Sequence, residues 1–174
     1  MMISAAQSIV SSLGEFTLFF WDTARASTRL PRRWGLFLKQ CEFIGVSSLG
    51  IITTAALFMG GVLGYQLYVS FHIFNAEALL GGTVGVSLFR ELAPVMGAIM
   101  VTGRAGAAMA AELASMRVSE QIDALEVMAV DPMEYLVLPR ILAGLLMMPL
   151  LSVYFGVIGS LAAAGVACGI MDLD

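Results

Sequence analysis

Four charged residues interrupt a stretch of the chain that is otherwise apolar: Arg90, Glu91, Arg104 and Glu112. Two arginines and two carboxylates in one apolar segment are the residue types of an ion or proton relay, because charges inside a membrane span usually mark a pathway. A secondary transporter or channel would use them in this way. Dependence of transport on membrane potential rather than on ATP would favour that function.

The energetic cost of burying Arg104 indicates what should surround it. An arginine at the centre of a membrane helix costs about 2.5–3.5 kcal/mol on insertion scales. Its guanidinium is therefore expected to face protein, water or a carbonyl, and the alternative is that it snorkels to the cytoplasmic interface. Glu112 lies on nearly the same helix face but roughly 12 Å further along the axis, so the two side chains need not touch.

A second group of polar residues forms the acidic segment 118–130. We expect a short helix there, with Ser119 as its N-cap and with Glu120 and Asp123 in a first turn where the helix dipole favours negative charge. Asp131-Pro132 should end it, because proline disfavours helix in the residue before it. The residues that would contact a partner are Glu120, Gln121, Ile122, Asp123, Leu125 and Glu126.

The two faces of this expected helix differ in chemistry. The three carboxylates share one side, and Ile122 and Leu125 lie on the other. A solvated acidic face is the alternative. A short helix held between two membrane spans is, however, better interpreted as a docking helix for a soluble partner.

Other chemistries have little support in the sequence. His72 is the only histidine, and no Cys/His cluster has the spacing of metal ligands. Cys41 and Cys168 would lie near opposite membrane faces, too far apart for a disulfide. No nucleophile–base pair suggests an intramembrane enzyme, and no GxxxxGK[ST] phosphate loop is present. We expect no metal, no cofactor and no enzymatic activity.

The composition predicts an all-α membrane protein. Of 174 residues, 59% are hydrophobic and only 13% are charged, whereas soluble domains average roughly 25% charged residues. The net charge of −4 is small, which gives nucleic-acid binding no support.

Three apolar runs exceed the length of about 20 residues that crosses a bilayer. They predict spans at 43–72, 83–116 and 136–171. Pro139 falls in the first turn of the third span, where its missing N–H costs little. Pro149 lies inside that span and is expected to kink it.

Small residues at every fourth position predict close helix packing, because lipid provides no hydrophobic drive between spans. The first span has Gly60-xxx-Gly64. The third has a ridge from Gly156 through Ser160 to Ala164. The second has two ridges, and this predicts a central, closely packed helix; they are Gly103-xxx-Ala107-xxx-Ala111 and Gly106-xxx-Ala110-xxx-Ala114.

Residues 1–40 are expected to lie at the membrane surface. Apolar residues recur on one face of residues 1–22, as in an interfacial amphipathic helix; packing on the protein's own spans is the alternative. A basic patch at 25–39 marks the cytoplasmic side. This predicts an inside N-terminus, an outside loop at 70–82 and an inside loop at 117–138.

Several strings together resemble the MlaE-type permease family, the membrane subunits of bacterial ABC transporters that work with MCE-domain proteins. The resemblance covers about residues 40–172 and rests on Leu88-Phe-Arg-Glu-Leu-Ala-Pro-Val95, Gly103-Arg-Ala-Gly106, Ala111-Glu112, Glu120-Gln-Ile-Asp-Ala-Leu125, Met128-Ala-Val-Asp-Pro132 and Pro139-Arg140.

The resemblance implies a single MlaE-type permease domain over 1–174 in a bacterial inner membrane. It implies a homodimer with a cytoplasmic ABC ATPase on segment 118–130, an MCE ring on the outer face, and phospholipid or a related lipid as substrate. The family's chain continues through two further spans, so this one is expected to be a fragment or to be completed by another chain. With the shared face of the first span, the resemblance places the lipid pocket at Leu57, Gly61, Tyr65, Tyr68 and Leu92, with Arg90 and Glu91 at its polar mouth.

Overall fold

The computed structural model describes Gly14, Thr17 and residues 34–170. The expected interfacial helix at 1–22 and most of the basic patch lie outside the described residues. Within residues 34–170 the regular elements are all helical, which agrees with the all-α prediction. The α-helices are α2 (Trp34–Ile44), α3 (Leu49–His72), α4 (Leu80–Ser87), α5 (Ala93–Val101), α6 (Ala107–Val118), α7 (Gln121–Val127) and α8 (Leu138–Ile170).

Three helical stretches are long and apolar enough to cross a membrane: Trp34–His72, Glu77–Val118 and Met133–Gly169. The prediction of three spans is therefore confirmed. The first two stretches begin at Trp34 and Glu77, before the expected starts at 43 and 83, because helical residues that include Lys39 and Glu42 precede the first apolar run and helical residues that include Glu77 precede the second.

Shorter helical segments interrupt these stretches. A 3₁₀ turn, η2 (Val46–Ser48), separates α2 from α3, and another, η3 (Glu77–Leu79), precedes α4. Wider π-helical turns form η4 (Leu88–Leu92), η5 (Thr102–Gly106) and η6 (Met133–Val137). Such π turns are rare and frequently mark functional sites.

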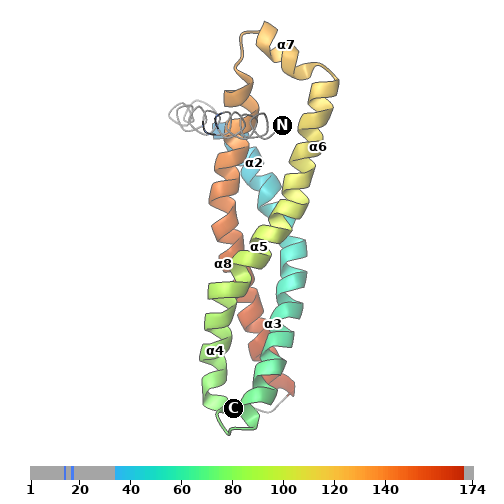
Figure 1. The fold of residues 1–174 in the computed structure, drawn as a ribbon. Coiled ribbons are helices and arrows are strands. Elements are labelled where there is room, and N and C mark those ends of the chain that lie inside the picture. Colours follow the sequence, from blue (N-terminus) through green and yellow to red (C-terminus); the bar gives the residue numbers. More distant parts are fainter. Residues whose placement is uncertain (1–13, 15–16, 18–33, 171–174) are drawn as a thin grey trace, which may run out of the picture. The chain divides into compact units, whose positions relative to one another are not determined.

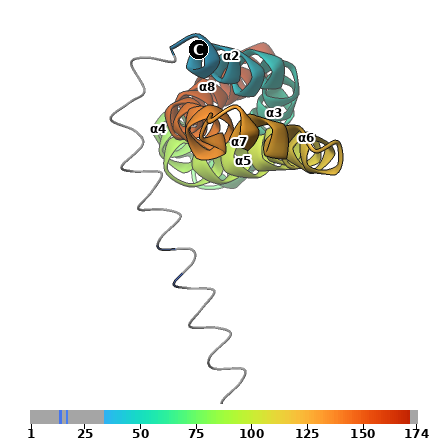
Figure 2. The same cartoon turned by 90° about the horizontal axis from the view of Figure 1, so that it is seen from above.

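Contacts divide the chain into two units, one of Met1–Gln40 with Ala114–Ala143 and one of Cys41–Leu113 with Gly144–Asp174. In the second unit α3 and α4 contact each other and are joined by a short turn (Figure 1). Within this unit α3 also contacts α5, and Figure 2 shows both helices end-on.

Glycines allow the close approach of α3 to α8 in this second unit. A Cβ on Gly60 would lie 2.1 Å from the carbonyl oxygen of Gly159, and one on Gly64 would lie 2.9 Å from Cα of Ala163. Only residues without side chains, or with small ones, permit such backbone contact. The packing role expected for Gly60-xxx-Gly64 is confirmed.

The ridge expected on the third span is shifted by three residues. Gly159 and the buried Ala163 face α3, whereas a Cβ on Gly156 would meet the ring of Phe89 at 2.5 Å, and Ala164 is exposed. The spacing of small residues recurs on more than one face of α8, so it could not identify which face is used.

The second span, which the sequence predicts to be central and closely packed, is open over its later half in this chain. No residue of α6 is buried, and a Cβ on Gly103 would meet nothing within 4 Å. Close packing occurs earlier, where a Cβ on Gly97 would lie 2.8 Å from Oγ of Ser152. Small residues show where a backbone can approach, but they do not show that a neighbour is present.

Candidate functional site

Arg104 lies in η5 and reaches the break between α2 and α3. Its Nη1 donates hydrogen bonds to the carbonyl oxygen of Phe43 at 3.2 Å and to Oγ of Ser48 at 2.9 Å. The guanidinium also lies over the ring of Phe43, with its carbon 5.6 Å from the ring centroid. The energetic cost of placing an arginine in lipid predicts that Arg104 faces protein, water or a carbonyl, and the Phe43 carbonyl is such a partner.

The end of α2 explains why the Phe43 carbonyl is available to Arg104. α2 ends at Ile44, and the last carbonyls of an α-helix have no partner within the helix. A cation near these carbonyls is also favoured by the helix dipole. Ser48 is fully buried in the 3₁₀ turn that follows. The sequence contains no direct signal for this contact, because the partners are 61 and 56 residues away from Arg104.

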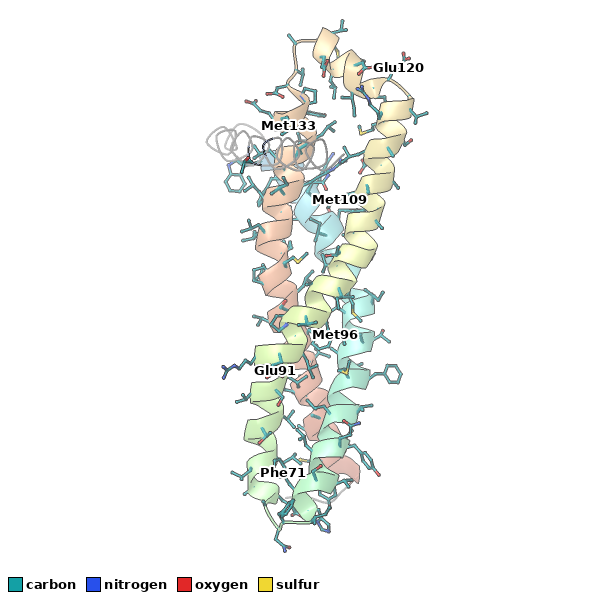
Figure 3. All side chains as sticks on the ribbon, viewed as in Figure 1. Phe71, Glu91, Met96, Met109, Glu120 and Met133 are labelled. Atoms are coloured by element: carbon teal, nitrogen blue, oxygen red, sulfur yellow. The ribbon has the colours of Figure 1, made fainter. Side chains whose placement is uncertain are left out.

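Arg90 and Glu91 lie well along the second span from Arg104 rather than beside it. Arg90 and Glu91 lie in η4 and are exposed, and Figure 3 labels Glu91 on this segment. Arg90 precedes Arg104 by 14 positions, about 21 Å of helix at 1.5 Å per residue. Glu112 is exposed on α6.

The expected lipid-pocket residues lie mostly on an open face. Leu57 and Tyr65 on α3 are 50% and 54% exposed. Gly61 is half-buried near Val166 of α8, and the ring of Tyr68 stacks on His72. Leu92 is half-buried in η4. The assignment of these residues to a pocket remains a prediction.

The acidic segment forms a shorter helix than expected. α7 spans Gln121–Val127, and Ser119 is not its N-cap. The Ser119 hydroxyl donates instead to the Ser115 carbonyl oxygen at 2.7 Å, because serine can bond back to the preceding helical turn. Glu120 precedes the helix with φ of 56°, so it is not in the first turn. Figure 3 shows Glu120 at this bend.

The C-terminus of α7 comes before Asp131-Pro132. The Ala129 N–H donates to the Glu126 carbonyl and the Val130 N–H to the Leu125 carbonyl, with Ala129 at φ of 55°. These two bonds form a Schellman motif, which terminates a helix without proline. Asp131 has another role, because its Oδ1 accepts a bond from the Met133 N–H at 2.9 Å, at the start of η6.

The acidic and apolar side chains on and beside α7 differ from the prediction in which of them are exposed. Asp123 accepts a 2.6 Å hydrogen bond from Arg117 and forms an ion pair with it. Glu120 and Glu126 are exposed. Ile122 and Leu125 are half-buried, whereas Val118 and Val127 are 87% and 88% exposed.

Comparison with known proteins gives consistent matches. Residues 37–174 match the family model described as Permease MlaE. A probable ABC transporter permease protein of Rickettsia felis is 39% identical over 181 residues, which covers 100% of this chain and 69% of that protein.

Two further relatives have more specific names. The intermembrane phospholipid transport system permease protein MlaE of Haemophilus influenzae is 42% identical over 148 residues, covering 85% of this chain and 57% of that protein. TRIGALACTOSYLDIACYLGLYCEROL 1, a chloroplastic protein of Arabidopsis thaliana, is 37% identical over 131 residues, covering 75% and 37%. The chain thus spans only part of the length of these relatives.

Proposed function

Because the chain belongs to the MlaE permease family, we propose that it is the permease subunit of an ABC transporter for phospholipids or related lipids. The observation that carries this proposal is the 42% identity to a permease named for intermembrane phospholipid transport. The lipid would pass between the inner membrane and an MCE-domain partner. A separate ATPase would supply the energy, and two permease copies would form the membrane unit.

The comparisons do not favour the ion or proton relay. They match permeases of ABC transporters. In addition, Arg104 bonds to Phe43 and Ser48, while Arg90 and Glu91 lie about 14 positions away on an exposed turn.

The segment 118–130 is the proposed docking site for the ATPase. A seven-residue helix is marginal in water by itself. It carries exposed carboxylates at Glu120 and Glu126 and exposed apolar side chains at Val118 and Val127. A groove with basic residues and an apolar floor would complement both, through charge-assisted hydrogen bonds and burial of apolar surface. The half-buried Ile122 and Leu125 would support the helix rather than fill the groove.

The proposed mechanism is mechanical. Closure of the ATPase dimer would displace α7, and α6 and the start of α8 would move with it because they flank it in the chain. Since Arg104 is bonded to Phe43 and Ser48, displacement of the second span at η5 would also pull on the start of the first span. A lipid held between the two copies could then be released toward the MCE ring or taken from it.

The proposed lipid pocket uses the face of α3 that bears Leu57, Gly61, Tyr65 and Tyr68, with Leu92 beside it and Arg90 and Glu91 at its mouth. Open apolar side chains at Leu57 and Tyr65 support a pocket that a second copy completes. Exposed Arg90 and Glu91 could pair with a zwitterionic headgroup.

The docking step can be tested in the complete transporter with two exposed positions. The double substitution Glu120→Lys with Glu126→Lys should release the ATPase from the purified permease, because two attractive contacts become repulsive. Val127→Asp should weaken the association about tenfold or more, since a new charge would be buried in the interface. The measurements are co-purification of the ATPase with tagged permease and the rate of ATP hydrolysis.

Glu77→Lys is the matched control, because it reverses a carboxylate at the turn between α3 and α4. It should leave the ATPase bound. Wild-type amounts of ATPase on both docking variants would show that this segment is not the docking site.

A further inference from the structure

A groove runs along the start of the first span, on the side that faces α8. Its walls come from the end of α2, the 3₁₀ turn and the first residue of α3 on one side, and from residues 147–154 of α8 on the other. Its volume is about 280 Å³, near the lower limit of about 300 Å³ for ligand sites in proteins. None of the seven expected lipid-pocket residues lines it.

The break between α2 and α3 creates the groove. Gly45 stands between the end of α2 and the start of the 3₁₀ turn, and a Cβ there would lie 3.0 Å from Sδ of Met147. Close contact at this glycine forms the floor. Val46 and Leu150 stand on opposite walls and remain 62% and 55% exposed.

The lining is almost entirely hydrocarbon. Among the described residues that line the groove, Tyr154 has the only hydroxyl group, and its oxygen lies 2.7 Å from Oγ1 of Thr53 in a hydrogen bond between α8 and α3. The ring of Tyr154 is therefore left as an apolar wall. Glu42 is the only charged residue of the lining, and it is exposed at the α2 end.

The depth of the groove matches a lipid that stands in one leaflet. Glu42 immediately precedes residues 43–76, a run without Asp, Glu, Lys or Arg that supplies the apolar part of the first span. A charged residue at the end of such a run is expected at headgroup level. Glu42 therefore lies at the headgroup end of the groove, and the apolar walls at Leu49 and Tyr154 lie deeper.

We propose that this groove binds one acyl chain of a phospholipid whose headgroup carries an amine. The chain would lie against Val46, Leu49 and Leu150, and the ammonium group would pair with the Glu42 carboxylate. A carboxylate at headgroup level favours a cationic amine over a headgroup that has only negative charge. The lipid would be a resident of the permease surface, so the proposal does not depend on transport.

Filling the groove should displace the lipid. Leu150→Trp adds a large side chain at an exposed wall position, and Leu161→Trp makes the same change on α8 at a residue that is 64% exposed and does not line the groove. The full chain would be purified in mild detergent from vesicles of phosphatidylethanolamine and phosphatidylglycerol in equal amounts. Native mass spectrometry would then count retained lipids.

We expect Leu150→Trp to lose a retained phospholipid that wild type and Leu161→Trp both keep. Far-ultraviolet circular dichroism would verify that both variants keep their helices. If Leu150→Trp retains the same lipid count as wild type, the groove is not a lipid site and a further protein segment is its better occupant.

The headgroup assignment has its own test. Glu42→Gln should lower the ratio of retained phosphatidylethanolamine to phosphatidylglycerol about twofold to fivefold, the effect of losing an exposed ion pair. Asp131→Asn removes an exposed carboxylate outside the groove, keeps an oxygen for the Met133 N–H, and should leave the ratio unchanged. An unchanged ratio in Glu42→Gln would overturn the amine assignment.

Discussion

At the scale of single residues, Arg104 shows how an arginine can be held within an apolar span. It satisfies a carbonyl at the end of α2 and a buried hydroxyl in the following turn. These groups would otherwise lack partners in a region with little water. The arginine and the helix end therefore stabilise each other, and neither is costly once both are in place.

The first prediction concerns this pair of bonds. Arg104→Leu should destabilise the folded chain by about 1–3 kcal/mol, because the Phe43 carbonyl and the Ser48 hydroxyl lose their donor. Ser48→Ala removes only one bond and should cost about 1 kcal/mol. Thermal unfolding in detergent measures both. An unchanged midpoint for Arg104→Leu would mean that the contact contributes nothing to stability.

The second prediction concerns Ala129, which has a left-handed backbone at the end of α7. Glycine adopts this conformation without the strain that a Cβ causes, so Ala129→Gly should stabilise the end of the helix by about 1 kcal/mol. Ala124→Gly, inside the helix, should destabilise it by about the same amount. Amide hydrogen exchange over residues 121–127 should become slower in the first variant and faster in the second. Equal exchange in both would contradict the assigned backbone.

At the scale of helices, the long uncharged runs are enough to predict the three spans, because an apolar run of about 20 residues is typical of a membrane-spanning helix. The sequence does not predict the π turns, nor the 3₁₀ turn after Gly45, where the close neighbour Met147 is distant in the sequence. For the same reason the partners of Arg104 could not be named from the sequence.

Local polar residues were a less reliable guide. Ser119 matched the pattern of an N-cap, yet its hydroxyl bonds to the preceding helix. Asp131-Pro132 was expected to end the acidic helix, yet a Schellman motif ends it earlier. Several capping arrangements compete within a few residues at such a bend, and their energies differ by about 1 kcal/mol. The assignment of residues to the lipid pocket remains a prediction.

The third prediction tests the crossing of α3 and α8. Gly60→Ala would place a methyl group against the Gly159 backbone, so the helices must separate, and a loss of about 1–3 kcal/mol is expected. Gly50→Ala makes the same change in α3 where nothing lies within 4 Å, and it should be neutral or stabilising. Thermal unfolding compares them. Equal midpoints would show that the backbones do not meet there.

At the scale of the whole molecule, the distribution of charge predicts the orientation in the membrane. The turn near Asn75 joins α3 to α4 and is expected outside, and α7 is expected inside. In a background with Cys41→Ala and Cys168→Ala, a membrane-impermeant thiol reagent added to the outer face should label Asn75→Cys and not Glu126→Cys. Both positions should react after the membrane is opened with detergent. Labelling of Glu126→Cys alone in intact cells would invert the arrangement.

The π turn at Thr102–Gly106 gives the second span a property that a uniform α-helix lacks. A π turn behaves as an α-helix into which one extra residue has been inserted. That extra residue is taken up within the turn, so the helix after it can face the same way as in an uninterrupted α-helix. Deleting one residue of Thr102–Gly106 should therefore remove the turn and leave the direction of α6 nearly unchanged, whereas the same deletion inside α6 would turn every later residue by about 100° about the helix axis. The turn is thus a place where the gene can lose one codon while the following helix keeps its direction.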